Sequence, residues 1–256
     1  MRVDVYMVAQ GAASSRTAAQ KLISAGVVTV DGRPVTKASE DIPDGKHDLC
    51  VGEIDELKYV SRGGLKLEAA LDAFGISVEG MTAADIGAST GGFTDCLLSR
   101  GARRVFCVDA GHGQLHPRIA SDPRVRSVEG CNARTLTADE LVRMEDEMPD
   151  FDGWVDLCVM DVSFISQTCI LPALSDIVRE GGTLVSLIKP QFELGASALG
   201  KGGVVKREAD REAAVRRVLA SADAAGFTSV GVIKSPIEGG DGNLEYVGYF
   251  RRVART

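Results

Sequence analysis

The chain has 256 residues, of which 45% are hydrophobic and 25% are charged, and this is the composition of an ordinary water-soluble globular protein. Its net charge of -7 argues against broad non-specific binding to polyanions, so any contact with nucleic acid must use a local basic patch. No apolar run reaches the roughly 18 to 20 residues of a membrane span, and the N-terminus lacks a signal-peptide core. We therefore expect a cytoplasmic protein.

The six cysteines are spread along the chain, at positions 50, 96, 107, 131, 158 and 169, and include no C-x-x-C pair. Several of them fall in predicted strands or helices, where a reduced cysteine behaves as a small apolar residue. The sequence therefore predicts neither a disulfide framework nor a metal site.

The first segment, residues 1–57, is typical of a small α+β domain. One helix begins at Arg2, a second begins after a serine N-cap and ends at Gly26, and residues 27–35 form two strands joined by an Asp-Gly turn. The segment resembles the S4 RNA-binding domain, which implies RNA as a partner. The resemblance is carried, in this order, by Arg2, Asp4, Ser15, Arg16, the helix through Ile23, and the stretch 26–32.

The resemblance to the S4 domain implies an RNA-facing helical surface. Arg2, Arg16 and Lys21 would grip phosphates there by shape rather than read bases, and Arg62 is the fourth predicted RNA contact. The alternative is a set of solvated charges without a ligand, because residues 1–56 hold six Lys and Arg against nine Asp and Glu. Binding by this segment alone is therefore expected to be weak and sensitive to salt.

Residues 58–65 are predicted to be a linker that runs into a helix ending at Phe74. Gly63-Gly64 is a pair that interrupts regular secondary structure, and the residues that follow have apolar side chains at helical spacing. Lys66 lies near the start of this helix, where a cation is unfavourable beside the helix dipole. Lys66 is therefore either a functional residue or an ordinary solvated lysine.

The stretch Asp85-Ile86-Gly87-Ala88-Ser89-Thr90-Gly91-Gly92-Phe93 lies between a predicted strand, 81–84, and a predicted helix, 93–98. Strand, glycine turn and helix form a cradle for a nucleotide-type cofactor, because glycines let the backbone approach the ligand. Ser89 replaces the second glycine of the dinucleotide fingerprint, and the Asp85 carboxylate would repel a phosphate. The turn therefore suits S-adenosylmethionine, which has a cationic end and no phosphate, and the alternative is an ordinary tight turn without a ligand. The predicted contacts are Asp85, Gly87, Ala88, Ser89, Gly91, Gly92 and Phe93.

A second predicted strand, 104–109, ends on Asp109. A carboxylate at this place can accept both ribose hydroxyls of an adenosine, whereas the alternative is a solvated acid in a turn. A third strand, 125–128, leads to Asn132, which would flank the adenine unless it serves only as a turn residue.

The remainder of residues 66–256 continues to alternate strand and helix. Further strands are predicted at 154–161, from 183 to Lys189, at 228–233 and at 245–250, with helices at 165–178 and 207–225. This order predicts an α/β, Rossmann-like, seven-stranded and mostly parallel sheet of the S-adenosylmethionine-dependent methyltransferase type, with an antiparallel strand at one side.

Asp161 and Lys189 close two neighbouring predicted strands, at the edge where such sheets bind ligands. A lysine at the end of an apolar strand is unfavourable unless it is paired or deprotonated. The pair is therefore either catalytic or a structural ion pair.

The whole chain resembles the TlyA (haemolysin A) family, in which an S4 domain is joined to an FtsJ-like ribose 2'-O-methyltransferase. The motifs that carry the resemblance are residues 60–67, 85–95, 161–166, 188–193 and 235–245. Lys66, Asp161, Lys189 and Glu245 stand where the Lys-Asp-Lys-Glu set of FtsJ-like enzymes would stand, and Asp161 would also contact the cofactor. The resemblance implies methylation of a ribose in ribosomal RNA, at cytidine, with S-adenosylhomocysteine as the product.

A ribose hydroxyl needs a base or strong orientation before it can attack a sulfonium methyl group. Lys189 is predicted to accept the hydroxyl proton, with Asp161 and Glu245 holding its amine and Lys66 countering their charge. No metal is required.

Three rival functions remain open. A nicotinamide oxidoreductase is disfavoured by Ser89 and by the RNA module. A binding-only RNA protein that senses the cofactor would need none of the four polar residues, and a haemolysin-like protein would need a membrane-inserting segment. The sequence is compatible with a monomer or a dimer, with ribosomal RNA or ribosomal subunits as partner. We also hypothesise that RNA docking on the first module orders residues 58–64 and so completes the cofactor site.

Overall fold

The chain folds into two separate units, residues 1–58 and 59–256, in a computed structural model. The structure describes residues 1–24, 26–43, 45, 47–52, 58–195, 198–239 and 242–253, without the side chains of residues 21, 24 and 201. Each unit has its own hydrophobic core.

The first unit packs two helices on a three-stranded antiparallel sheet of order β2-β1-β3. Apolar side chains of both helices and of β1, among them Val3, Met7 and Val28, form its core. The two helices and the β1–β2 hairpin confirm the sequence prediction, whereas β3 was not predicted. The elements are α1 (Val3–Ala9), α2 (Arg16–Ser24), β1 (Val28–Val30), β2 (Arg33–Pro34) and β3 (Leu49–Val51).

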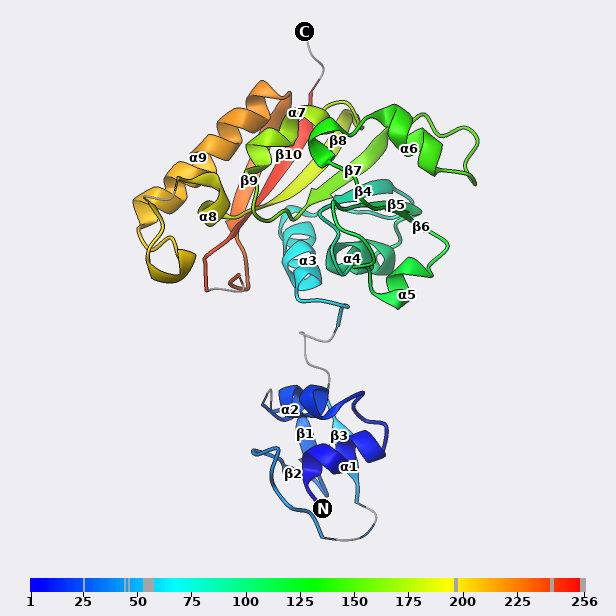
Figure 1. The fold of residues 1–256 in the computed structure, drawn as a ribbon, viewed down its shortest axis with the longest axis vertical. Helices are drawn as coiled ribbons and strands as arrows, with labels where there is room; N and C mark the ends of the chain where they lie inside the picture. The colour runs from blue at the N-terminus through cyan, green and yellow to red at the C-terminus, as the bar shows by residue number, and fades with distance from the viewer. Residues whose placement is uncertain are drawn as a thin grey trace. The chain divides into compact units, whose positions relative to one another are not determined.

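The second unit is built on a seven-stranded sheet of order β6-β5-β4-β7-β8-β10-β9 (Figure 1). Only β10 runs antiparallel, between β8 and β9, which confirms the predicted mostly parallel sheet. The strands are β4 (Thr82–Ile86), β5 (Arg104–Val108), β6 (Val125–Val128), β7 (Val155–Met160), β8 (Val178–Ile188), β9 (Phe227–Lys234) and β10 (Tyr246–Arg252).

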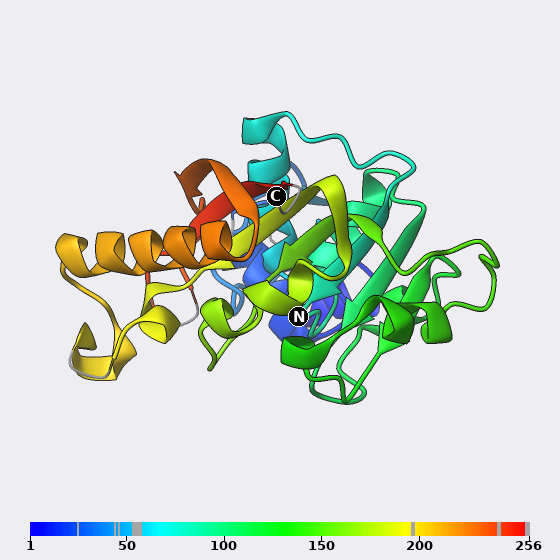
Figure 2. The same cartoon turned by 90° about the horizontal axis from the view of Figure 1, so that it is seen from above.

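Helices cover both faces of this sheet. On one side, α3 (Gly63–Phe74), α4 (Gly92–Ser99) and α5 (Pro117–Ala120) pack over side chains such as Ala83, Val105 and Leu187. On the other side lie α6 (Ala138–Met144), α7 (Leu171–Leu174) and α9 (Glu208–Ala224) (Figure 1). Seen from above, α9 lies at one end of the sheet and the β6 strand lies at the other (Figure 2).

Two elements differ from the sequence prediction. The expected helix over 165–178 is a 3₁₀ turn, η3 (Gln167–Cys169), followed by the single turn α7, after which β8 begins at Val178. Pro172 lies in the first turn of α7, where proline is tolerated, and it prevents the helix from starting as early as residue 165, because proline has no N–H to donate. β4 also runs two residues further than expected, so Asp85 lies inside the strand and not at its end.

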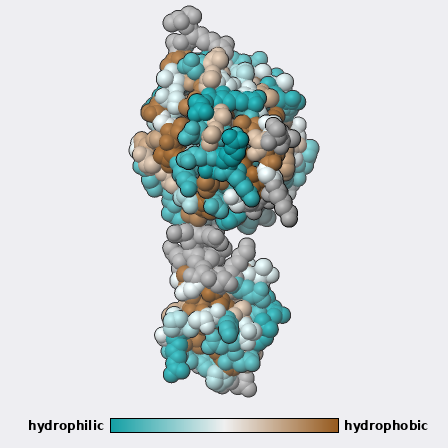
Figure 3. All heavy atoms as spheres, turned by 90° about the vertical axis from the view of Figure 1, so that its left-hand side faces the viewer, coloured by the Kyte–Doolittle hydropathy of each residue, from teal (hydrophilic) through white to brown (hydrophobic). Residues whose placement is uncertain are grey.

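The surface on the side of α9 mixes hydrophilic and hydrophobic residues, and its hydrophobic residues lie in small patches (Figure 3). All six cysteines are free thiols. Among the described residues, no helix is long and apolar enough to cross a membrane.

Candidate active site

The turn after β4 brings two strand ends into close contact. Gly87 has a φ of 81°, and a Cβ added there would lie 2.6 Å from the carbonyl oxygen of Asp161 at the end of β7. Ser89 also adopts a positive φ of 47°, which is uncommon outside glycine. Gly91, with a φ of 90°, is the N-cap of α4. The sequence of this turn therefore permits a backbone approach that a larger side chain at position 87 would prevent.

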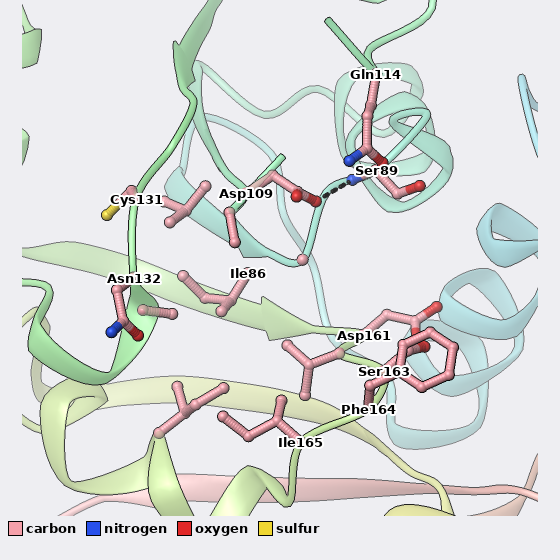
Figure 4. A pocket seen from close by; sticks show the side chains of 16 residues that line it. Ile86, Ser89, Asp109, Gln114, Cys131, Asn132, Asp161, Ser163, Phe164 and Ile165 are labelled. Atoms are coloured by element: carbon pink, nitrogen blue, oxygen red, sulfur yellow. Dashed lines mark hydrogen bonds between the residues drawn. The ribbon is translucent and has the colours of Figure 1, made fainter. Parts of the chain in front are cut away.

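A cavity of about 440 Å³ opens beside this turn, at the carboxyl ends of β4, β5 and β7. Figure 4 shows Asp109 and Gln114 on one side of it, Cys131 and Asn132 on another, and Asp161, Ser163 and Phe164 on a third. The lining residues are Ile86, Gly87, Ser89, Val108, Asp109, Ala110, Gln114, Cys131, Asn132, Ala133, Asp161, Val162, Ser163, Phe164, Ile165 and Ile170.

Asp109 is fixed in this cavity by two backbone donors. The N–H of Ser89 donates to Oδ2 at 2.8 Å, and the N–H of Gly111 donates to Oδ1 at 2.8 Å (Figure 4). A carboxylate offers about four acceptor sites, so each oxygen can still accept a further hydrogen bond. A diol is the ligand group that such a carboxylate would suit.

Asp85 lies behind the cavity and not on its wall. Its side chain is fully buried, and its Oδ2 accepts from the backbone N–H of Thr94 at 3.0 Å and from the Thr94 hydroxyl at 2.7 Å. No described residue donates to Oδ1. Burial raises the pKa of this carboxyl to about 7, while the hydrogen bonds from Thr94 oppose the rise.

The other predicted cofactor residues divide between the cavity and the start of α4. Asn132 lines the cavity, and its Oδ1 accepts the N–H of Arg134 at 3.2 Å, which makes it the N-cap of a 3₁₀ turn, η2 (Ala133–Thr135). Ala88, Gly91, Gly92 and Phe93 are buried around the beginning of the helix.

Lys189 follows β8 and reaches across to the end of β7. Its Nζ lies 2.5 Å from Oδ1 of Asp161 and donates to the Ser163 hydroxyl at 2.8 Å. The side chains of Lys189 and Asp161 are 11% and 22% exposed, so the pair is sheltered yet open to a ligand.

Lys66 and Glu245 form a second pair, between α3 and the residue before β10. Lys66 Nζ lies 2.5 Å from Oε2 of Glu245, and both residues are buried. A Cβ added at Gly239 would lie 2.5 Å from Oε1 of Glu245, so this glycine leaves room for the carboxylate. The four predicted catalytic residues are therefore arranged as two ion pairs.

A second cavity, of about 320 Å³, joins the two pairs. Lys189 and Glu245 both line it, together with Gln191, Phe192, Leu199 and Gly203. Ser163 and Phe164 line this cavity as well as the first. The Asp161–Lys189 pair thus spans the boundary, because Asp161 lines the first cavity and Lys189 lines the second.

Phe164 is the most exposed large hydrophobic residue described, at 92%. It has a positive φ of 64°, which is a strained conformation for a bulky side chain, and its ring centroid lies 5.2 Å from that of Phe192. The two rings form an aromatic surface in the second cavity, and Phe164 also lines the first.

A family model for the FtsJ-like methyltransferases matches residues 59–252, and a model for the S4 domain matches residues 1–47. The chain belongs to the FtsJ-like methyltransferase family. This family membership implies the use of S-adenosylmethionine. We refer below to residues 59–256 as the FtsJ-like unit and to residues 1–58 as the S4 unit.

Relatives match nearly the whole chain. TlyA of Mycobacterium tuberculosis, named as a 16S/23S rRNA (cytidine-2'-O)-methyltransferase, is 44% identical over 98% of this chain and 89% of its own length. Hemolysin A of Brachyspira hyodysenteriae is 41% identical over 98% of this chain and 99% of its own. A solved structure described as a candidate hemolysin from Streptococcus thermophilus is 41% identical, covers 99% of this chain and 88% of that one, and has a TM-score of 0.74. The resemblance to the TlyA family is confirmed.

In the S4 unit, two of the predicted RNA contacts share one acid. Arg2 and Arg16 both pair with the fully buried carboxylate of Asp4, at 2.9 and 3.1 Å, and Gln20 also donates to it. These hydrogen bonds hold the pKa of Asp4 far below its usual range. Both arginines remain accessible, with side chains 42% and 56% exposed.

The two remaining predicted RNA contacts are placed differently. Lys21 lies in α2, and its side chain falls outside the described residues. Arg62 is exposed and is the N-cap residue of α3 in the FtsJ-like unit.

Sequence reasoning did not single out Ser163, Phe164 and Gln114 as lining residues of the first cavity. Ser163 and Phe164 had a usable signal, since they follow Asp161 directly at a strand end where ligands bind. Gln114 had none, because it lies in a loop whose path the sequence does not define.

Proposed function

We propose that the FtsJ-like unit transfers a methyl group from S-adenosylmethionine to the 2'-hydroxyl of a ribose in ribosomal RNA, at a cytidine. The names of the relatives support the substrate class. The observation that carries the proposal is the Asp161–Lys189 pair, which spans the boundary between the two adjoining cavities. One cavity would hold the methyl donor and the other the ribose.

The residues of the first cavity fit an adenosine without phosphate. Asp109 would accept the ribose hydroxyls, Asn132 and Cys131 would flank the base, and the Gly87–Ser89 turn would lie against the remainder. The cavity lining includes two carboxylates and no lysine or arginine, which suits a cationic ligand and not a phosphate. When bound, S-adenosylmethionine supplies an electrophilic methyl group on a sulfonium.

Lys189 would act on the ribose hydroxyl. In its neutral form the Nζ would accept the hydroxyl proton, while Asp161 and Ser163 hold the amine toward the second cavity. Glu245, fixed by Lys66, lines the same cavity and would orient the ribose. Such positioning is the main contribution available to residues that form no covalent bond with the substrate.

The aromatic surface of Phe164 and Phe192 suits the base of the same nucleotide. Enzymes that act on a single nucleotide take it out of its stack and hold its base against aromatic rings. The exposed ring of Phe164 borders both cavities, so a base stacked on it would place its ribose near Lys189.

The S4 unit would bring the RNA to this site. Arg2, Arg16, Lys21 and Arg62 are the proposed phosphate contacts, although Asp4 already neutralises part of the charge of two of them. Because ribosomal RNA is the proposed partner, we place the protein in the cytoplasm, and S-adenosylhomocysteine is the expected product.

The test is transfer of labelled methyl from S-adenosylmethionine to purified small and large bacterial ribosomal subunits. We expect the native chain to form 2'-O-methylcytidine, detected after nuclease digestion, and Lys189→Ala to abolish it while still binding the cofactor. Lys234→Ala, at the end of β9 and outside both cavities, is the matched control and should transfer normally.

Two outcomes would contradict the proposal. If S-adenosylmethionine binds but neither ribosomal subunit is labelled, a binding-only RNA protein that senses the cofactor is the favoured function. If Lys189→Ala labels RNA at the native rate, Lys189 is not the base. Because the Brachyspira relative is named Hemolysin A, leakage of lipid vesicles is the assay for the alternative of a membrane-active, haemolysin-like protein.

A further inference from the structure

Glu193 is a buried acid that none of the roles above uses. It ends the single turn α8 (Pro190–Glu193), four residues after Lys189, and is 2% exposed. Within the described part of the chain its carboxylate is in no ion pair, so hydrogen bonds alone compensate its burial. A buried charge of this kind is unfavourable unless its acceptor sites are filled.

Both oxygens of Glu193 bind the segment that follows β7. Oε2 accepts from the Ser166 hydroxyl at 2.5 Å, and Oε1 accepts from the backbone N–H of Gln167 at 2.9 Å. This segment begins with Asp161 and carries Ser163, whereas Glu193 belongs to the segment that begins with Lys189. The carboxylate thus joins these two segments, which among the described residues are otherwise connected only by the polar contacts of Lys189.

Gln167 continues the connection back to the sheet. Its side chain is buried, and its Nε2 donates to the carbonyl of Leu187 in β8 at 3.3 Å. Its Oε1 accepts from the Ser186 hydroxyl, also in β8. A closed ring of contacts therefore runs from β8 through Lys189 and Glu193 to Gln167 and back to β8.

We propose that Glu193 is a positioning residue for methyl transfer, which holds the Asp161–Ser163 segment in register with Lys189; this inference rests on the proposed function. The 2.5 and 2.8 Å contacts of Lys189 cross between the same two segments. A shift of one segment by about 1 Å would break them and move Phe164, and displacements of that size can lower a rate on the order of 100-fold.

The experiment measures single-turnover transfer by the full chain to the ribosomal subunit that the native protein methylates, at saturating S-adenosylmethionine. Glu193→Ala should lower the rate constant by about 10- to 100-fold, with little change in cofactor affinity measured by calorimetry. Glu193→Gln should recover most of the rate, because its amide can still accept the Gln167 N–H and can donate to the Ser166 oxygen. Ser166→Ala, which removes one of the two donors, should fall between Glu193→Ala and the native chain.

The matched control is Glu145→Ala. The side chain of Glu145 is also buried, but it pairs with Arg104 at 2.8 Å and Arg126 at 3.4 Å at the opposite edge of the sheet. Its loss should lower the melting temperature without changing the rate constant below that temperature.

A native rate in folded Glu193→Ala would overturn the inference. If Glu193→Ala does not fold, a native rate in Ser166→Ala would overturn it equally. Failure of the proposed function is a separate result, since the native chain itself would then label neither subunit.

Discussion

The buried carboxyl of Asp85 provides a quantitative test of the fold around the cofactor turn. Replacing it by asparagine keeps its shape and an acceptor for Thr94, and removes its charge. In the folded chain burial raises its pKa from 3.8 to about 7, and the nearby charge of Asp161 adds to the rise. Asp85→Asn should therefore gain stability relative to the native chain as the pH is raised.

The sign and size follow from proton linkage. Between pH 4 and 7 the folded chain retains a proton on Asp85 that the unfolded chain has lost, so the free energy of unfolding of the native chain falls as pH rises through this range. The full difference between the two pKa values corresponds to roughly 4 kcal/mol. The asparagine NH₂ group places two buried donors where Oδ1 of Asp85 has no described partner, which costs on the order of 1–3 kcal/mol for each unpaired donor, but equally at every pH.

The assay is urea unfolding at pH 5, 6, 7 and 8, followed by fluorescence of Trp154, the single tryptophan, which lies in the FtsJ-like unit. The difference in unfolding free energy between Asp85→Asn and the native chain should rise by about 1 kcal/mol for each pH step up to 7 and then level off. Asp223→Asn, an exposed change on α9, should give a flat difference. A flat difference for Asp85→Asn would refute the reasoning, because Asp85 would then ionise as an exposed acid does.

Other changes test the remaining parts of the structure. Gly87→Ala places a Cβ 2.6 Å from the carbonyl oxygen of Asp161, so we expect a loss of roughly 1–3 kcal/mol in urea unfolding and weaker S-adenosylmethionine binding by calorimetry; unchanged affinity would contradict the close approach. Lys66→Met leaves the Glu245 carboxylate buried without its cation and should cost about 3–5 kcal/mol, part of which the added change Glu245→Gln should restore. His47 has the Asp31 carboxylate 2.7 Å from Nδ1 and the Pro43 carbonyl 2.9 Å from Nε2, and its hydrogen bond to Asp31 raises its pKa. The stabilisation by protonated His47 is present below about pH 6.5 and is lost as the pH rises through the higher folded-state pKa. The melting temperature of the native chain should therefore fall over this pH range, and that of His47→Gln should not show this fall.

The parts of the fold that follow local sequence rules were predicted. Glycines in the turn after β4, a strand ending before Asp109 and the alternation of strand and helix each reflect a few neighbouring residues. The mostly parallel sheet with one antiparallel strand follows from how such units pack. These features are accessible from the sequence because each depends on periodicity or turn chemistry.

The predicted boundaries are wrong where contacts between residues distant in the sequence determine the structure. β4 extends through Asp85 because this residue pairs with Cys107 of β5 on one side and with Val159 of β7 on the other. No local sequence pattern predicts that pairing. The helix expected over 165–178 shortens because Gln167 is drawn to β8 and Val178 pairs with Val155 instead. Tertiary hydrogen bonds override the local apolar pattern in both cases.

The candidate site shows the same division. The sequence indicated four polar residues and placed Asp161 beside Lys189, yet it could not show that Lys66 pairs with Glu245. Glu193 was visible only as the last residue of a motif. Its role depends on hydrogen bonds to residues 26 and 27 positions earlier, which no spacing rule reveals.

The contacts of residues 59–64 bear on how the two units communicate. Gly64 must be a glycine because a Cβ there would lie 2.4 Å from the Tyr59 ring, and a Cβ at Gly92 would lie 2.1 Å from the Ser61 hydroxyl. The N–H of Val60 donates to Asp95 in α4 at 2.8 Å. The chain therefore joins the FtsJ-like unit at the start of α4, directly after the cofactor turn.

This attachment sharpens the hypothesis that RNA docking on the S4 unit completes the cofactor site. Because the Ser61 hydroxyl lies against Gly92, a displacement of residues 59–64 would reach α4 and the turn that precedes it. If docking acts in this way, S-adenosylmethionine must bind more tightly to the full chain when ribosomal RNA is present, and by linkage the cofactor must strengthen RNA binding by the same factor. Equal affinities with and without RNA would mean that residues 59–64 serve the cofactor site only as a fixed support.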